Sequence, residues 1–343
     1  MESDMKSAIQ QIRVLVEEKK KLLLDKSFGE EDNGEVFSRE ASLKIIEFLN
    51  LGIQKLSHTL TKMTILLSER PLPKMKEMIP LFNELSQEIG QFYEIFTTVY
   101  PIHFGVQLKQ MYKLACVDAL EVIDEVLKET INNVYNKEKL LKANGCVWET
   151  CNKLKSLPRD MLQLCVWKCQ TEYDTLVDAE EELKSEINEH QESDFNFDDS
   201  SWSDEDLKLL TPASGLIKTA HSACKKIKQC TARSGKLDTV AQIKDLDSTC
   251  RAVSTLSPGV DDLVTSLYPP LVKKQVFVAV QSLLSALESI LSNLLATHFI
   301  QTEDNKWIDF LQKAVQHNGS KLLDSLAYNA QDVASEMNEM SIS

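Results

Sequence analysis

LNLGIQKLSHTLTKMTILL, residues 49–67, is the stretch of this chain that decides its fold. Its large apolar residues recur at alternating spacings of four and three residues. Because an α-helix has about 3.6 residues per turn, this spacing gathers them into one stripe, as in helices that pack at shallow angles in a bundle. The segment therefore predicts a long helix that is buried along one side. The stripe consists of Leu49, Ile53, Leu56, Leu60, Met63 and Leu67.

The same periodicity continues along most of the 343 residues. Glycine and proline, which hairpins and tight turns need, number only 10 and 9, roughly half of average usage. This scarcity indicates long helices with few connections. Helices are predicted at about residues 3–26, 38–69, 74–100, 106–132, 137–156, 159–190, 204–235, 238–256, 257–268, 271–299 and 303–340.

The length of the chain indicates more than one hydrophobic core, because single cores stop growing at roughly 250–300 residues. We therefore predict an all-α protein made of two helical bundles, with about five to six helices in each. The first bundle covers residues 1–190 and the second covers residues 204–343. An acidic linker, residues 191–203, is predicted to join them.

The excess of acidic residues in this chain is concentrated around that linker. Between Asp178 and Asp206, thirteen acidic residues stand against one lysine, so this stretch supplies −12 of the formal net charge of −14. Three interpretations are open. The stretch is a solubilising linker, or it is phosphorylated at Ser201 and Ser203, each of which has an acidic residue three positions on, or it is a docking segment with charge-exposed apolar anchors. Those anchors would be Phe195, Phe197 and Trp202.

Charge and hydropathy argue against several classes of protein. A net charge of −14 disfavours nucleic acid as a direct ligand, because duplex binding depends on Lys and Arg. The most apolar stretch, residues 276–299, is interrupted by polar residues such as Gln281 and Glu288, which favours a bundle helix over a membrane span. No apolar leader follows Met1, and the eight cysteines lack the paired spacing of a secreted scaffold. We expect reduced thiols in an intracellular protein that binds no membrane.

The sequence carries no motif for catalysis, cofactor binding or metal binding. Phosphate-binding glycine loops, dinucleotide fingerprints and metalloprotease or hydrolase signatures are all missing. The six histidines are scattered singly, and Cys165 and Cys169 lack the second ligand pair that a zinc site needs. We therefore predict no cofactor, no metal and no enzymatic activity, and expect the protein to act by contacts, as a monomer.

Five segments together resemble the cyclin-D-binding protein family, also described as maternal-Id-like helix-loop-helix proteins. They span nearly the whole chain and follow the order found in the family, and the segment at residues 257–271 is the most specific of them. They read SERPLPK (68–74), CVWETCNKLKSLPRD (146–160), WSDEDLKLLTPASGLIKTAHSACKKIK (202–228), SPGVDDLVTSLYPPL (257–271) and KWIDFLQKAV (306–315).

The resemblance implies a non-catalytic negative regulator of the cell cycle and of transcription, shared between cytoplasm and nucleus. Members of the family are described as binding D-type cyclins and helix-loop-helix transcription factors. Their architecture is described as two bundles of the vinculin and catenin kind. The matching helix-loop-helix pair here is Lys137–Ser156 and Arg159–His190. No basic run precedes this pair, so DNA contact through it is not predicted.

Cyclins commonly dock an Arg-x-Leu peptide, and the chain contains this pattern twice. Arg13-Val14-Leu15 lies inside a predicted helix, whereas Arg70 and Leu72 lie in a proline-rich turn and are the better candidates. An alternative from another class is a cytoskeletal or adhesion adaptor, which rests on bundle architecture alone.

Overall fold

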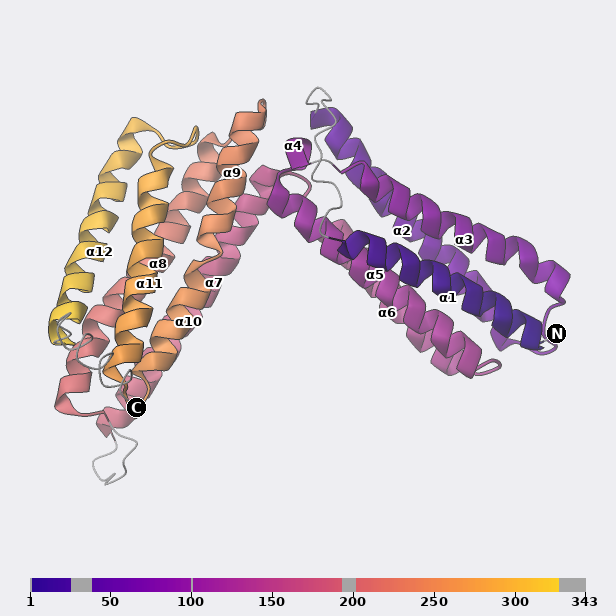
Figure 1. The fold of residues 1–343 in the computed structure, drawn as a ribbon, viewed down its shortest axis with the longest axis horizontal. Helices are drawn as coiled ribbons and strands as arrows, with labels where there is room; N and C mark the ends of the chain where they lie inside the picture. The colour runs from indigo at the N-terminus through magenta and orange to yellow at the C-terminus, as the bar shows by residue number, and fades with distance from the viewer. Residues whose placement is uncertain (1, 26–38, 100, 193–201, 327–343) are drawn as a thin grey trace, which may run out of the picture. The chain divides into compact units, whose positions relative to one another are not determined.

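The computed structural model describes residues 2–25, 39–99, 101–192 and 202–326. Every regular element within these ranges is a helix (Figure 1). The all-α fold class is therefore confirmed. The stripe of residues 49–67 behaves as its spacing predicts, because all six of its apolar side chains are at most 1% exposed.

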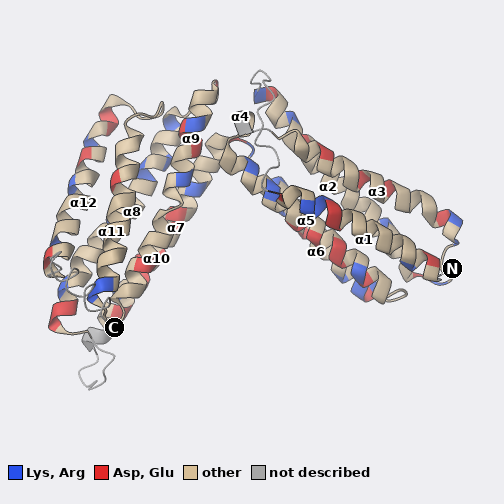
Figure 2. Ribbon diagram, viewed as in Figure 1, with Lys and Arg blue, Asp and Glu red and all other residues tan. Residues whose placement is uncertain are grey.

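The chain divides into two compact units. Unit 1 comprises Met1–Met161 together with Asp238–Ile243, and unit 2 comprises Leu162–Leu237 and Lys244–Ser343. Lysine, arginine and acidic residues are interspersed over the helices of both units (Figure 2). Each unit buries its own apolar core, as the two-core expectation from chain length requires.

Unit 1 is a closed ring of long helices. Helix α2 packs on α3 and α6, helix α5 packs on α6 and α1, and α1 packs on α3, so each long helix has a neighbour on both sides. A short helix, α4, lies against α5 and α2. The core fills the inside of the ring. The helices are α1 (Glu2–Leu24), α2 (Arg39–Ser68), α3 (Met75–Thr97), α4 (Pro101–Phe104), α5 (Val106–Asn132) and α6 (Lys137–Ser156).

Unit 2 closes in a similar way. Helix α12 packs on α8 and α11, and α10 packs on α11 and α8. Helix α7 contacts α8 where Cys165 Sγ lies 3.9 Å from Thr231 Oγ1. It contacts α10 where Glu172 accepts a hydrogen bond from the Ser257 backbone N–H. The elements are α7 (Met161–Glu192), α8 (Asp204–Ser234), α9 (Val240–Val253), α10 (Leu256–Leu267), α11 (Lys273–Leu294), η1 (Thr302–Asp304) and α12 (Asn305–Ser325). The start of α9, residues 240–243, is grouped with unit 1, and the rest of α9 with unit 2.

The predicted domain boundary is corrected by the structure. The prediction placed residues 159–190 in the first bundle and the acidic residues 191–203 between bundles, but α7 belongs to unit 2. The reason is physical: α7 buries its apolar stripe in unit 2, beside α8 and α10. The acidic stretch therefore connects two helices of one unit and does not separate the units. The buried stripe of α7 includes Leu164, Cys165, Cys169, Leu176 and Leu183.

Helix α11 is the one described helix long and apolar enough to cross a membrane by length and composition alone. In unit 2 it packs against α10 and α12. Its buried side includes Val276, Leu283 and Leu287, while Gln281 and Glu288 are exposed. A helix that separates apolar from polar residues in this way suits a bundle, as the interrupted hydropathy of this stretch predicts.

The revised boundary can be tested with two fragments of the chain. We expect residues 162–343 to unfold cooperatively in urea, because α7 covers the cores of its neighbours. We expect residues 191–343, cut at the boundary predicted from sequence, to lose that cooperativity, because the stripe that α7 covers is left exposed to water. Circular dichroism during urea titration is the measurement. Equal stability of the two fragments would contradict the assignment of α7 to unit 2.

Candidate functional site

The predicted Arg-x-Leu docking peptide lies in the turn between α2 and α3. Arg70 is exposed, with its guanidinium carbon 4.7 Å from the centroid of the Tyr135 ring. Leu72, however, is only 9% exposed and forms part of the buried core. A docking leucine has to enter a pocket on the partner, but the side chain of Leu72 is packed inside unit 1. The prediction that Leu72 is presented for docking is wrong.

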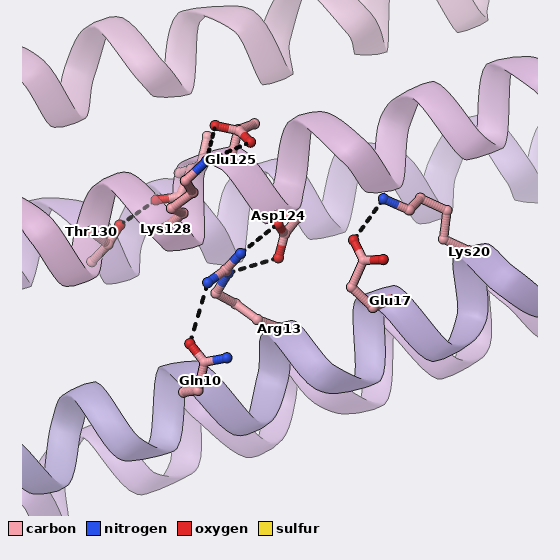
Figure 3. A network of polar contacts seen from close by, with 9 residues as sticks. Gln10, Arg13, Glu17, Lys20, Asp124, Glu125, Lys128 and Thr130 are labelled. Carbon is pink, nitrogen blue, oxygen red and sulfur yellow. Dashed lines mark hydrogen bonds and ion pairs between the residues drawn. The ribbon is translucent and has the colours of Figure 1, made fainter.

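In the second Arg-x-Leu match, Arg13-Val14-Leu15, the arginine is used to hold the fold together. Arg13 lies on α1 and its guanidinium donates two hydrogen bonds of 2.8 Å to the carboxylate of Asp124 on α5 (Figure 3). Asp124 is 7% exposed. A bidentate pair of this kind holds two helices in one register. Arg13 therefore ties α1 to α5 and is not offered to a partner.

Under the docking interpretation of the acidic stretch, Trp202 would be an exposed anchor, and the structure corrects this. Its side chain is 7% exposed. The indole Nε1–H donates a 2.6 Å hydrogen bond to the carbonyl oxygen of Leu267, at the C-terminus of α10. The last carbonyls of a helix lack partners within the helix, so this bond satisfies one of them. Trp202 is a structural residue of unit 2. Phe195 and Phe197, the other predicted anchors, lie outside the described residues.

Ser203, a predicted phosphorylation site, begins α8 with a capping box. Its hydroxyl accepts a hydrogen bond from the Asp206 backbone N–H, and the Asp206 carboxylate accepts one from the Ser203 backbone N–H. The side chain is exposed. A phosphate on Ser203 would face the Asp206 carboxylate and replace this capping pair with like-charge repulsion. Ser201, the other predicted site, lies outside the described residues.

The helix-loop-helix pair implied by the family resemblance corresponds to α6 and α7. The two helices fall into different units. Helix α6 buries Leu140, Val147 and Leu154 in unit 1, where it packs on α2 and α5. Helix α7 buries its own stripe in unit 2. Dimerisation through these buried stripes would require each helix to leave its own unit.

The cysteines are mostly buried thiols. Seven of the eight are buried and only Cys146 is exposed. Burial raises the pKa of both Cys224 and Cys250 to about 12, so these thiols stay protonated at neutral pH. Within the described ranges, no group of three or more His, Cys, Asp or Glu side chains is arranged to hold a metal ion.

Glu180 on α7 is a buried carboxylate of unit 2 with several polar partners. It is 5% exposed and lies 2.7 Å from Lys184 Nζ and 3.0 Å from His221 Nε2 on α8. Burial acts to raise the pKa of Glu180, but the hydrogen bonds from Lys184 and His221 outweigh it and hold the pKa below its usual value. The contact with His221 joins α7 to α8, so the cluster supports the fold.

The best candidate for a binding site is a groove between α5 and α6 in unit 1, which we call the α5–α6 groove. It consists of two adjoining hollows of about 410 and 700 Å³ that share Glu121 and Val122. Its floor is largely apolar, and Leu114 within it is 49% exposed. The apolar lining comprises Met111, Leu114, Ala115, Val122, Val126, Ala143, Leu154 and Leu157.

The two sides of the α5–α6 groove carry opposite charge. Helix α5 presents an acidic ridge and α6 presents a basic ridge. Among the described residues the ion pairs of these ridges stay on their own helices, as with Lys128 and Glu125 at 3.2 Å on α5, so neither ridge neutralises the other. The acidic ridge is Asp118, Glu121, Glu125 and Glu129, and the basic ridge is Lys139, Lys142 and Lys153.

Sequence reasoning missed this groove. The acidic ridge has a signal in the sequence, because its members are spaced by three, four and four residues and so share one helix face. The basic ridge lies on the following helix, and only the packing of α5 against α6 brings the two ridges to opposite sides of one groove.

Comparison with known protein families assigns this chain to one of them. A model described as "Grap2 and cyclin-D-interacting, N-terminal" matches residues 49–189, and its C-terminal counterpart matches residues 178–296. This chain belongs to the Grap2 and cyclin-D-interacting family. The two models overlap at residues 178–189, within α7, whereas the units of the structure divide after Met161, the first residue of that helix.

Curated relatives match almost the whole chain. Human cyclin-D1-binding protein 1 is 28% identical over 338 residues, covering 91% of this chain and 92% of its own. The homologue from Xenopus laevis is 27% identical, covering 90% of this chain and 96% of its own. The homologue from Danio rerio is 25% identical and covers 80% of this chain and 84% of its own. The Grap2 and cyclin-D-interacting family is one of interaction proteins, and the α5–α6 groove lies within the matched region.

The role of Glu180 gives a test by pH. We expect Glu180→Gln to lower the free energy of unfolding at pH 7 by about 1–3 kcal/mol, because it removes charged hydrogen bonds from a buried site. Since the folded pKa is depressed, the contribution is present above the unfolded pKa of about 4.3 and is lost as pH falls through the folded value. The gap between wild type and variant should therefore close in acid. Urea titrations across pH 3–7 measure it.

Glu181→Gln is the matched control, because Glu181 is the next residue on α7 and is exposed. We expect it to change stability by less than about 0.5 kcal/mol at any pH. An equal loss in both variants at pH 7 would contradict the structural role of Glu180.

The contribution of Trp202 to stability can be tested by comparison with a half-exposed tryptophan. We expect Trp202→Phe to cost about 2 kcal/mol of unfolding free energy, because the buried Leu267 carbonyl loses its donor and a cavity remains. Trp148, which is 53% exposed, supplies the control, and Trp148→Phe should cost less than about 0.5 kcal/mol. Urea unfolding monitored by circular dichroism measures both. A Trp202→Phe protein of unchanged stability would show that the packing does not need the indole.

Proposed function

We propose that this protein is a non-enzymatic negative regulator that binds D-type cyclins. The observation that carries the proposal is the extent of the similarity. Human cyclin-D1-binding protein 1 matches 91% of the chain, and the match covers 92% of the human protein. Both units therefore have counterparts in a protein named for cyclin D1 binding.

The physical character of the chain supports a role in protein contacts. Charged residues of both signs are interspersed over the helices (Figure 2), a pattern that suits selective protein contacts better than binding to a polyanion. The α5–α6 groove adds an apolar surface with charged rims, the usual composition of a protein-binding site.

The proposal extends to helix-loop-helix transcription factors, which this protein would bind and restrain, with action in both cytoplasm and nucleus. Binding would use surfaces of the folded units. Exchange of α6 or α7 with a partner's helix would expose an apolar stripe and open a unit, against a total stability of only about 5–15 kcal/mol for a typical domain. Docking onto a surface needs no such opening.

Cyclin binding is tested with purified proteins. We expect calorimetry to detect saturable binding of a D-type cyclin and no binding of a cyclin from another class. The protein should also slow phosphorylation of the retinoblastoma protein by the kinase bound to that cyclin. Arg70→Ala should leave the affinity within about twofold, because the buried Leu72 prevents the turn from acting as an Arg-x-Leu peptide.

Two outcomes would contradict the proposal. One is the absence of cyclin binding by folded, full-length protein. The other is co-sedimentation with actin filaments in place of cyclin binding, which would favour the adaptor role suggested by helical-bundle architecture.

A further inference from the structure

We propose that the α5–α6 groove is the docking site for an amphipathic helix of a partner protein. That helix would bury an apolar stripe on the groove floor, with basic residues along one flank and acidic residues along the other. The inference rests on the proposed function only in that the protein acts by binding other proteins. It does not require the partner to be a cyclin.

The dimensions of the groove suit a helix. On α5 its lining runs from Met111 to Glu129, which is about 27 Å at 1.5 Å per residue. A partner helix of about 18 residues has this length. Its anchors at positions i, i+3, i+4 and i+7 would face the floor, as in other helix-in-groove complexes.

The floor offers apolar surface that the fold of unit 1 does not use. Leu114 is 49% exposed, and Met111, Val122 and Leu157 are half-buried. Helices α5 and α6 contact each other below these residues and leave the groove open above them. Covering this surface with a partner's apolar stripe would supply the affinity.

The two ridges define which helix fits. Glu121 and Glu125 on one side, and Lys139 and Lys142 on the other, are exposed. A helix with lysines facing α5 and glutamates facing α6 would pair with both ridges. Because each of these pairs is partly exposed and screened by salt, the charges would act mainly on specificity and orientation. A helix with glutamates on both flanks would be repelled by α5.

A second copy of this chain is a poorer occupant. The long helices of both units already bury their apolar stripes inside their own rings. A helix from another copy would have to leave its ring to enter the groove. A partner whose helix is free, or folds on binding, avoids that cost.

The exposed Cys146 provides a reporter for the test. It lines the groove on α6, and the other seven cysteines are buried, so a polarity-sensitive maleimide would label the full-length protein at this position. Two designed 18-residue helical peptides share one apolar stripe. The mixed peptide carries lysines on one flank and glutamates on the other, and the acidic peptide carries glutamates on both. Calorimetry with unlabelled protein checks that the label does not block the groove.

We expect the wild-type protein to bind the mixed peptide at least about tenfold more tightly than the acidic peptide at physiological salt. Glu121→Lys combined with Glu125→Lys puts two lysines in the middle of the α5 ridge and brings the charge of its four residues from −4 to zero, while the α6 ridge stays basic. The lysine flank of the mixed peptide then loses its partners, so this variant should prefer the acidic peptide. The matched control is Glu47→Lys combined with Glu84→Lys, which makes the same charge change at exposed positions of α2 and α3. The control should keep the wild-type preference.

A reversed preference is a gain of binding that a misfolded variant cannot show. The inference is overturned if the groove variant keeps the wild-type preference, or if the control variant reverses it. It is also overturned if the label responds to protein concentration without peptide, because the groove would then join two copies. Cyclin binding without selective peptide binding leaves the proposed function standing and removes this inference. Selective peptide binding without cyclin binding removes the proposed function and leaves this inference standing.

Discussion

Each long helix of this chain carries one apolar stripe, and the need to cover that stripe on both sides shapes the rest of the structure. A single neighbouring helix leaves part of the stripe in contact with water. In unit 1 the contacts from α1 to α5, α6, α2, α3 and back to α1 close a ring in which every long helix has two neighbours. Unit 2 follows the same rule with α7, α8, α10, α11 and α12.

Buried polar groups determine how the helices are aligned within each ring. Asp304 at the start of α12 is 4% exposed and accepts hydrogen bonds from the Gln301 backbone N–H at 2.9 Å and from the Trp307 indole at 3.1 Å. It also pairs with Arg233 near the end of α8. Apolar contacts tolerate sliding of one helix along another, whereas a buried carboxylate that loses its donors costs a few kcal/mol. Such groups hold distant segments in one alignment.

The sequence predicts local features of this protein well and their pairing poorly. The stripe of residues 49–67 and the bounds of α6 at Lys137–Ser156 depend on residues within a few turns of each other, and the structure confirms them. The unit to which α7 belongs depends on which neighbours cover its stripe, and periodicity carries no information about that. The predicted exposure of Trp202 was wrong for the same reason. The partner that buries Trp202 is the carbonyl of Leu267, 65 residues away, and the acidic neighbours of Trp202 in the sequence gave no sign of it. The α5–α6 groove combines a local feature and a pairing. The spacing of its acidic ridge can be seen in the sequence, but the sequence does not show that the basic ridge of α6 lies opposite.

The place of the acidic stretch within unit 2 has a consequence for how the chain tolerates change in length. A connection that closes a hairpin between α7 and α8 contributes to stability mainly through the entropy of loop closure. That entropy changes by only about 0.6 kcal/mol for each doubling of loop length. Insertions or deletions between these two helices are therefore inexpensive so long as the helices themselves remain intact. The connection of residues 157–160 between α6 and α7 is different, because it passes from one unit to the other. Related chains can thus diverge in length at the acidic connection while keeping both rings.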